Sequence, residues 1–274
     1  MTVIDAHCNL GEVLFFGKMV PLKKSMELLD EAEIDKVVAV SVKVLHYHMT
    51  EGNDEMGRWM KQHPDRIFGY CTVNPRHGRL AIEEIDRCVN AYGMVGVKIN
   101  AVDPVPLNEP VTMEICARIA ELGLPLLAHT GPQASAAVSQ QLPDLKLIMA
   151  HMGNTLNPAR GDWPWAIKVA QEFPNIYLET SGSSPDFGYI DAAVEAIGPD
   201  RVLFGTDFPV FDLHIEKAKV TGSEISVAAK RKLLGENAAR LFGIGQHAAT
   251  AAGARLRPPA PAAADARVRL SGPR

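Results

Sequence analysis

Short apolar runs alternate with segments of helical periodicity along most of the chain. The apolar runs are rich in β-branched residues and cover residues 2–7, 36–42, 66–73, 94–100, 124–130, 145–151, 175–181 and 201–207. Each is followed by a segment with helical spacing, shown most clearly in residues 78–92 by the stripe Leu80, Ile82, Ile85 and Val89. Continuous apolar strands that alternate with helices indicate a parallel sheet covered by helices.

The number of these strand–helix units predicts the architecture. Eight units of roughly 30 residues occupy about the first 245 residues, which is typical of a (β/α)8 TIM barrel in a single domain. An open doubly wound sheet is the alternative. It is disfavoured because no G-x-G-x-x-G or GxxxxGK[ST] motif follows a predicted strand, and because polar residues end strands all round the set.

Composition divides the chain into two parts. Residues 246–274 are rich in Ala, Pro and Arg without apolar periodicity, so we expect a barrel over residues 1–245 and a disordered tail over 246–274. No apolar run approaches ~18 residues and the N-terminus lacks a basic, apolar leader, so we expect a cytoplasmic protein without a membrane span. The formal net charge of −4, with mixed signs, gives no reason to expect nucleic acid or an anionic membrane as a partner. A homodimer is the default expectation for such a barrel.

Polar and titratable residues gather at the carboxyl ends of five predicted strands. They are the run Asp5-Ala6-His7-Cys8-Asn9, the run Lys98-Ile99-Asn100, His129, His151 and Asp207. In a TIM barrel these ends meet on the face where active sites form, and side chains two apart on a strand, such as His7 and Asn9, share a face. One histidine at a strand end is most often a hydrogen-bonded structural residue. Residues of these types on five strands favour a shared ligand, because imidazole and carboxylate suit Zn²⁺, Mn²⁺ or Fe²⁺.

The same residues carry a resemblance to a known family. The order D-x-H at strand one, His at strand five, HMG at strand six and GTDFP at strand eight resembles the amidohydrolase superfamily. Within it, the chain is similar to the "amidohydrolase 2" branch, which includes aminocarboxymuconate-semialdehyde decarboxylase and related hydrolases and lactonases. The similarity spans Val3 to Gly243, and the closing GENAARLFGI is similar to the last helix of that branch.

The resemblance implies roles for individual residues. His7, His129 and Asp207 correspond to metal ligands, Asp207 also moves the proton of a bound water, and His151 corresponds to an acid/base or polarising group. The implied cofactor is a divalent metal ion, with Zn²⁺ expected first and Mn²⁺ or Fe²⁺ as alternatives.

Asn9 and Lys98 are the two positions whose roles the resemblance does not fix. Asn9 stands where the family has the second histidine of H-x-H, and an amide oxygen is a weak ligand for zinc. A weaker metal site, a replacement ligand from Glu12 or His151, and a metal-free site therefore all stay open. Lys98 lies where some superfamily branches carry a carboxylated lysine. We assign Lys98, with Asn9 and Asn100, to binding a small substrate that carries a carboxylate.

These assignments lead to one leading function and three alternatives. The leading function is a hydrolase that uses a metal-activated water on an ester, lactone or amide carbonyl of a small acidic substrate. One alternative is a non-oxidative decarboxylase of a carboxylated aromatic or dienoic acid. The others are a metal-free lactonase with Asp207 as base, and a barrel that binds a small molecule without turning it over.

Overall fold

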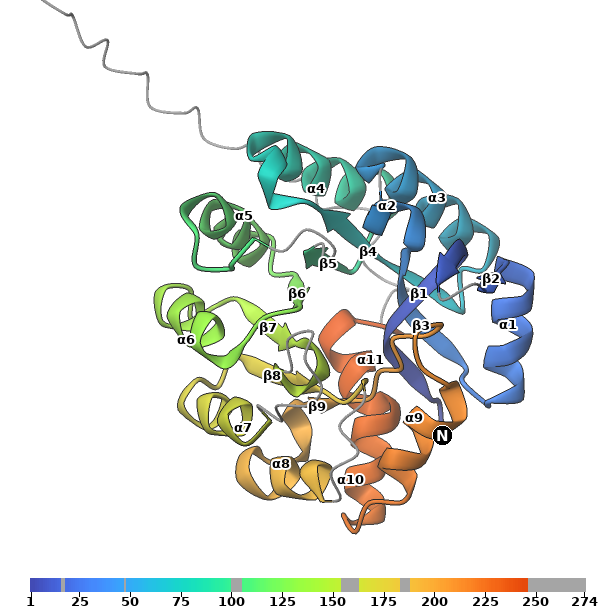
Figure 1. Cartoon of the computed structure of the whole chain (residues 1–274), viewed down its shortest axis with the longest axis vertical. Coiled ribbons are helices and arrows are strands. Elements are labelled where there is room, and N and C mark those ends of the chain that lie inside the picture. Colours follow the sequence, from blue (N-terminus) through green and yellow to red (C-terminus); the bar gives the residue numbers. More distant parts are fainter. Residues whose placement is uncertain (16–17, 47, 100–104, 154–162, 183–187, 246–274) are drawn as a thin grey trace, which may run out of the picture.

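Eight parallel strands form a nearly closed barrel with helices between them (Figure 1). The computed structural model describes residues 1–15, 18–46, 48–99, 105–153, 163–182 and 188–245. The parallel strands are β1 (Ile4–Phe15), β3 (Lys36–Ser41), β4 (Ile67–Val73), β5 (Gly96–Ile99), β6 (Pro125–Ala128), β7 (Lys146–Met149), β8 (Ile176–Glu179) and β9 (Val202–Leu203). They confirm the barrel predicted from the sequence, and each coincides with one of the predicted apolar runs apart from a longer β1.

Helices surround the strands. They are α1 (Leu22–Glu31), α2 (Val42–His46), α3 (Met49–Gln62), α4 (Arg79–Tyr92), α5 (Pro110–Glu121), α6 (Pro132–Gln141), α7 (Trp163–Glu172), α8 (Tyr189–Ile197), α9 (Leu213–Thr221), α10 (Val227–Arg231) and α11 (Asn237–Phe242). Short helical turns lie at η1 (Pro75–His77), η2 (Ala150–Gly153) and η4 (Pro199–Arg201), and a π-helical turn, η5, covers Lys232–Glu236. Within the described residues, no helix is long and apolar enough to cross a membrane.

Contacts between β1 and the segment after β9 close the barrel. Ala6 N donates to Phe204 O at 2.9 Å, and Asn9 N donates to Phe208 O at 2.7 Å. The buried Asp5 carboxylate accepts from Thr206 Oγ1 at 2.5 Å and from Thr206 N at 3.0 Å. The residues that follow the eighth strand are thereby fixed against the first strand.

Two apolar layers reflect the alternation of side chains along each strand. One layer lies between the strands and the outer helices, and Val97, Leu126 and Leu147 belong to it. The other fills the barrel and contains Tyr70, Leu127 and Ile148 together with Phe242 from α11. The Tyr70 and Phe242 rings meet edge to face, with their centroids 5.6 Å apart. Lys98 pairs with Leu127 across the sheet, which places it on the inner face.

Two features depart from the sequence analysis or fall outside it. A short antiparallel strand, β2 (Lys18–Val20), pairs with the distal part of β1, and no signal in the alternation predicted this hairpin. The predicted tail, residues 246–274, lies outside the described residues, as does Asn100.

Candidate active site

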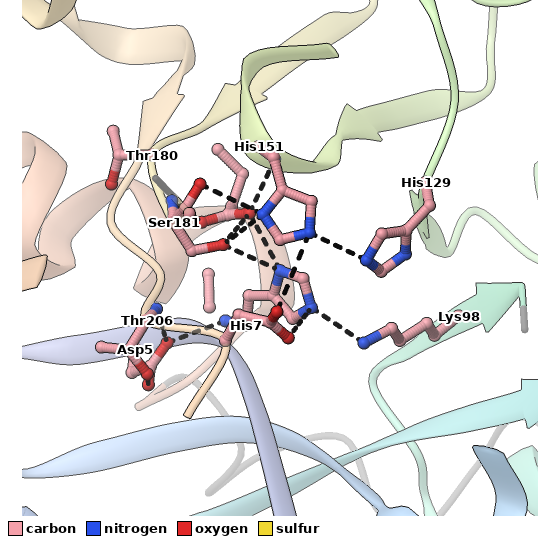
Figure 2. Close-up of polar contacts among 12 residues, drawn as sticks. Asp5, His7, Lys98, His129, His151, Thr180, Ser181 and Thr206 are labelled. Atoms are coloured by element: carbon pink, nitrogen blue, oxygen red, sulfur yellow. Dashed lines mark hydrogen bonds and ion pairs between the residues drawn. The ribbon is translucent and has the colours of Figure 1, made fainter. Parts of the chain in front are cut away.

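Side chains from six neighbouring points of the barrel meet at the carboxyl end of its strands (Figure 2). They are His7 and Asn9 on β1, Lys98 on β5, His129 after β6, His151 after β7, Glu179 and Ser181 at the end of β8, and Asp207 after β9. Figure 2 shows the three imidazole rings and the Lys98 side chain pointing toward one another. The structure therefore brings together all the predicted site residues that it describes.

The end of β8 fixes the orientation of His7. His7 Nδ1 lies 2.9 Å from Glu179 Oε2 and both side chains are fully buried. Burial alone would raise the pKa of Glu179, but the charge of His7 and its hydrogen bond outweigh that effect and lower the pKa to about 2. Because an ionised carboxylate only accepts, Nδ1 of His7 carries the hydrogen, and Nε2 is the nitrogen that faces the site.

The carbonyl and hydroxyl oxygens of Ser181 fix the orientation of the His151 ring. His151 Nδ1 lies 3.1 Å from Ser181 O and 3.0 Å from Ser181 Oγ, and Ser181 Oγ donates to Glu179 Oε2 at 2.8 Å. A carbonyl oxygen only accepts, so Nδ1 of His151 carries a hydrogen and Nε2 faces the centre. A short polar stretch thus sets the hydrogen positions of two histidines.

His129 and His151 share a direct contact. Their Nε2 atoms are 2.9 Å apart. Burial lowers the pKa of both groups, and in His129 the Lys98 ammonium and the other two histidines lower it further, well below its usual value. His129 Nδ1 is buried and has no partner among the described residues.

Asp207 lies close to three other residues of the site. Its Oδ1 lies 3.1 Å from His7 Nε2 and accepts from Asn9 Nδ2 at 2.8 Å, and its Oδ2 lies 3.9 Å from His151 Nε2. Burial opposes ionisation, but the charges of His7, His151 and Lys98 hold the pKa of Asp207 well below its usual range.

The backbone is strained where two of these side chains enter the site. His151 and Asp207 have φ angles of 54° and 52°, in the left-handed region that costs a non-glycine residue ~1–3 kcal/mol. Met152, next to His151, has φ 53°. Such strain persists only where the surrounding structure enforces it, and here it coincides with the cluster of titratable groups.

Lys98 completes the cluster from the inner face of β5. Its ammonium is almost fully buried, lies 2.8 Å from His7 Nε2 and donates to Asn9 Oδ1 at 3.2 Å. Burial lowers the pKa of Lys98, and the nearby carboxylates of Asp207 and Glu179 oppose that effect. The pKa of His7 is raised in turn, because Asp207 and Glu179 outweigh burial and the Lys98 charge.

The donor set fits a divalent ion. One ligand atom each from His7, His129 and His151 lies within 4.8 Å of the others, and Asp207 contacts two of these rings. Imidazole and carboxylate suit Mn²⁺ and Zn²⁺, and metal-binding histidines ordinarily have their other nitrogen held by a partner, as in His7 and His151. The sequence analysis assigned His151 an acid/base role and left it open as a replacement ligand, and the structure places its ring in one cluster with His7 and His129.

Glu179 and Ser181 are functional candidates that the sequence analysis missed. They lie in the E-T-S run that ends the seventh predicted strand, at the same edge as the other site residues. The usable signal was a carboxylate at the end of an apolar strand, where burial requires a partner.

Comparisons with known proteins place the chain in a family. The sequence model of the family described as amidohydrolase matches residues 4–244. A gamma-resorcylate decarboxylase from Polaromonas sp. is 27% identical over 246 residues, which covers 69% of this chain and 74% of that protein.

Solved structures share the fold. The crystal structure of 2,6-dihydroxybenzoate decarboxylase from Rhizobium superposes with a TM-score of 0.71 at 19% identity, covering 89% of this chain and 99% of that one. A dihydroxybenzoic acid decarboxylase from Polaromonas sp. JS666, with bound manganese and the inhibitor 2-nitroresorcinol, gives 0.68 at 20% identity and covers 89% and 97%. Since the family match spans most of the chain, this protein belongs to the amidohydrolase family of enzymes.

Proposed function

We propose that the protein is a metal-dependent, non-oxidative decarboxylase of a hydroxylated aromatic carboxylic acid. This is the alternative that the sequence left open, and it replaces hydrolysis as the leading function. The relatives named above are decarboxylases of dihydroxybenzoates, which supports the substrate class.

The chemistry of the relatives carries the choice, since those named above are decarboxylases. In the hydrolase mechanism the Asp207 carboxylate takes a proton from water and needs an oxygen free to do so. Its Oδ1 accepts from Asn9 and lies 3.1 Å from His7 Nε2, which leaves Oδ2, 3.9 Å from His151 Nε2, for that role. Decarboxylation needs no water to be deprotonated; it needs a proton donor beside the substrate.

His151 is the proposed proton donor. The bond between the ring carbon and the carboxyl carbon breaks, its electron pair stays on the ring carbon, and carbon dioxide leaves. The same ring carbon takes a proton from Nε2 of the doubly protonated His151 ring, so that an acid anion and one proton yield the arene and carbon dioxide. Because burial lowers the pKa of His151, the ring takes up this proton from solvent before each turnover. The His151 side chain is 14% exposed, which lets solvent return the proton.

The remaining site residues are proposed to bind the metal ion and the substrate. His7, His129 and Asp207 would hold the ion, and the manganese in the Polaromonas structure makes Mn²⁺ the first ion to test, with Zn²⁺ second. When bound, such an ion would supply positive charge that offsets the negative charge of the substrate. Lys98 and Asn9 stay proposed substrate contacts, although both are now paired within the site, so a substrate must replace those hydrogen bonds.

Labelled substrate tests the proposal. The Mn²⁺-loaded protein is incubated with hydroxybenzoates that carry a ¹³C carboxyl group, in D₂O, beside a panel of lactones and esters. We expect labelled carbon dioxide and one deuterium at the ring carbon that lost it. We also expect a loss of at least about 100-fold in rate for His151→Gln, since general acid catalysis contributes ~10²–10⁴-fold, and none for the exposed control His77→Gln. Turnover of a lactone or ester without carbon dioxide release would instead restore the hydrolase.

A further inference from the structure

Lys98 contacts the nitrogen of His7 that a metal ion would bind. Glu179 holds His7 Nδ1, so Nε2 is the nitrogen available to an ion. Lys98 Nζ lies 2.8 Å from that same Nε2. A hydrogen lies between Lys98 Nζ and His7 Nε2, and either nitrogen can carry it. In both cases the Nε2 lone pair, which a metal ion needs, is not available.

Asn9 holds this arrangement in place. Its Oδ1 accepts from Lys98 Nζ at 3.2 Å, and its Nδ2 donates to Asp207 Oδ1 at 2.8 Å and to Phe208 O at 3.1 Å. Asn9, which stands where the family has a histidine, therefore binds the Lys98 ammonium through its oxygen and the Asp207 carboxylate through its nitrogen. All three side chains are buried, so water cannot readily replace these bonds.

We propose that Lys98 is a built-in competitor of the metal ion, and that the ion binds His7 only by displacing the Lys98 ammonium. The chain thus binds a divalent ion more weakly than the same donor set would without Lys98. Once displaced from His7, the ammonium keeps Asn9 Oδ1 as its remaining described partner. The inference rests on the proposed function only in its use of a divalent ion at this site.

Metal affinity without substrate tests the competition. Mn²⁺ and Zn²⁺ dissociation constants are measured by dye competition and calorimetry for the whole chain and for Lys98→Met, which keeps the length of the side chain and removes the amine. We expect at least tenfold tighter binding in the variant. The control is Lys146→Met, which removes a partly buried lysine from the start of β7, far from His7 along the barrel, and leaves the affinity unchanged. Weaker metal binding in Lys98→Met would overturn the proposal, because it would mean that Lys98 helps to bind the ion. Unchanged binding would overturn it too, because a competitor must lower the affinity while it is present.

A second variant guards against a folding defect. Lys98→Ala opens a cavity beside His7, and ethylammonium added to this variant takes the place of the lost amine. We expect metal binding in Lys98→Ala to weaken as ethylammonium is added, while binding in the unaltered protein does not respond. No response in Lys98→Ala, shown to be folded by circular dichroism, would contradict the proposal. Failure of every hydroxybenzoate to react would refute the proposed function and leave these affinities intact.

Discussion

At the scale of single residues, Glu179 organises more of the site than any predicted residue does. It accepts from His7 Nδ1 at 2.9 Å, from Ser181 Oγ at 2.8 Å and from His151 N at 3.2 Å, and also from Ser181 N. One buried carboxylate thereby orients both imidazoles. The three groups that reach Glu179 Oε2 arrive from β1, from η2 and from the end of β8, so its position couples separate parts of the barrel.

Glu179→Gln tests this coupling. The amide can present its NH₂ group to His7 Nδ1 and reverse which nitrogen carries the hydrogen, so that Nε2 no longer offers a lone pair. We expect metal affinity to fall by about 10–100-fold, the usual cost of losing a partner that orients a metal-binding histidine. Dye competition measures it, with the exposed Glu172→Gln on α7 as control. A variant that binds metal as tightly as the unaltered chain would show that the tautomer of His7 is set elsewhere.

Gly205 gives a second prediction at this scale. A Cβ at this position would lie 2.2 Å from Glu179 Oε1 and 2.8 Å from His7 Cβ, neither of which has room to move. We expect Gly205→Ala to lower the free energy of unfolding by ~1–3 kcal/mol and to weaken metal binding at least tenfold.

The matched control is Gly69→Ala on β4. There a Cβ would lie 2.6 Å from Met60 Sδ and 2.8 Å from Met56 Cγ, two flexible side chains that can adapt. Urea unfolding should show some loss of stability in this variant while its metal affinity stays unchanged. Equal losses of metal affinity in the two variants would contradict a specific role for the space at Gly205.

At the scale of elements, helix α9 holds the end of β8. Lys219 Nζ donates to Thr180 O at 3.0 Å and to Gly182 O at 2.5 Å, on either side of Ser181. Glu216, one turn earlier on α9 and also buried, forms an ion pair with Lys219. The strand end that orients His7 and His151 is thus itself held by a helix on the outer face of the barrel.

Glu216 makes this contact sensitive to pH. Burial raises its pKa to about 8, although Lys219 opposes the rise. A carboxyl group with a raised pKa in the folded state contributes stability fully below its ordinary pKa of 4.5 and loses it as the pH rises through about 8. We expect the chain to lose stability relative to Glu216→Gln over this window, by at most ~1.4 kcal/mol per pH unit.

Urea unfolding of both proteins at pH 5 and pH 8 measures the difference, with the exposed Glu195→Gln on α8 as control. The free energies of unfolding of the two proteins should differ by different amounts at the two pH values. An equal difference at both would contradict the raised pKa of Glu216.

The same scale shows what the sequence could and could not predict. Alternation located all eight barrel strands because each buries an apolar run, and the strand ends placed His7, Lys98 and Asp207 on one face. The hydrogen bonds of Glu179 and Ser181 could not be predicted, since they join residues up to 174 positions apart and depend on side-chain direction. The pairing of Lys98 with His7 was missed for the same reason: parity gives the face of a strand and not the partner across the barrel.

At the scale of the whole molecule, the described barrel ends where the family match ends. The family model stops at residue 244, and Leu241, Phe242 and Ile244 are the last residues buried in the inner apolar layer. Asn237, at the start of α11, donates to Pro199 O at 2.7 Å and to Val202 O at 2.8 Å, which ties this helix to the base of β9. The chain up to Gly245 therefore contains both the site and the packing that supports it.

Two truncations test whether residues 1–245 form the working unit. A chain that ends after Gly245 should bind metal equally well and unfold within about 2 °C of the full chain, because it keeps the site and the packing that supports it. A shift of that size corresponds to at most ~1 kcal/mol. A chain that ends after Glu236 loses α11 and with it Phe242, whose ring packs against Tyr70 inside the barrel. Removing a buried aromatic residue alone costs ~3–5 kcal/mol, so this second chain should unfold at a much lower temperature or fail to fold. Differential scanning calorimetry and dye competition on the three proteins decide the matter. A large loss of stability or of metal affinity on removing residues 246–274 would mean that they belong to the working unit, and that the division of the chain at residue 245 is wrong.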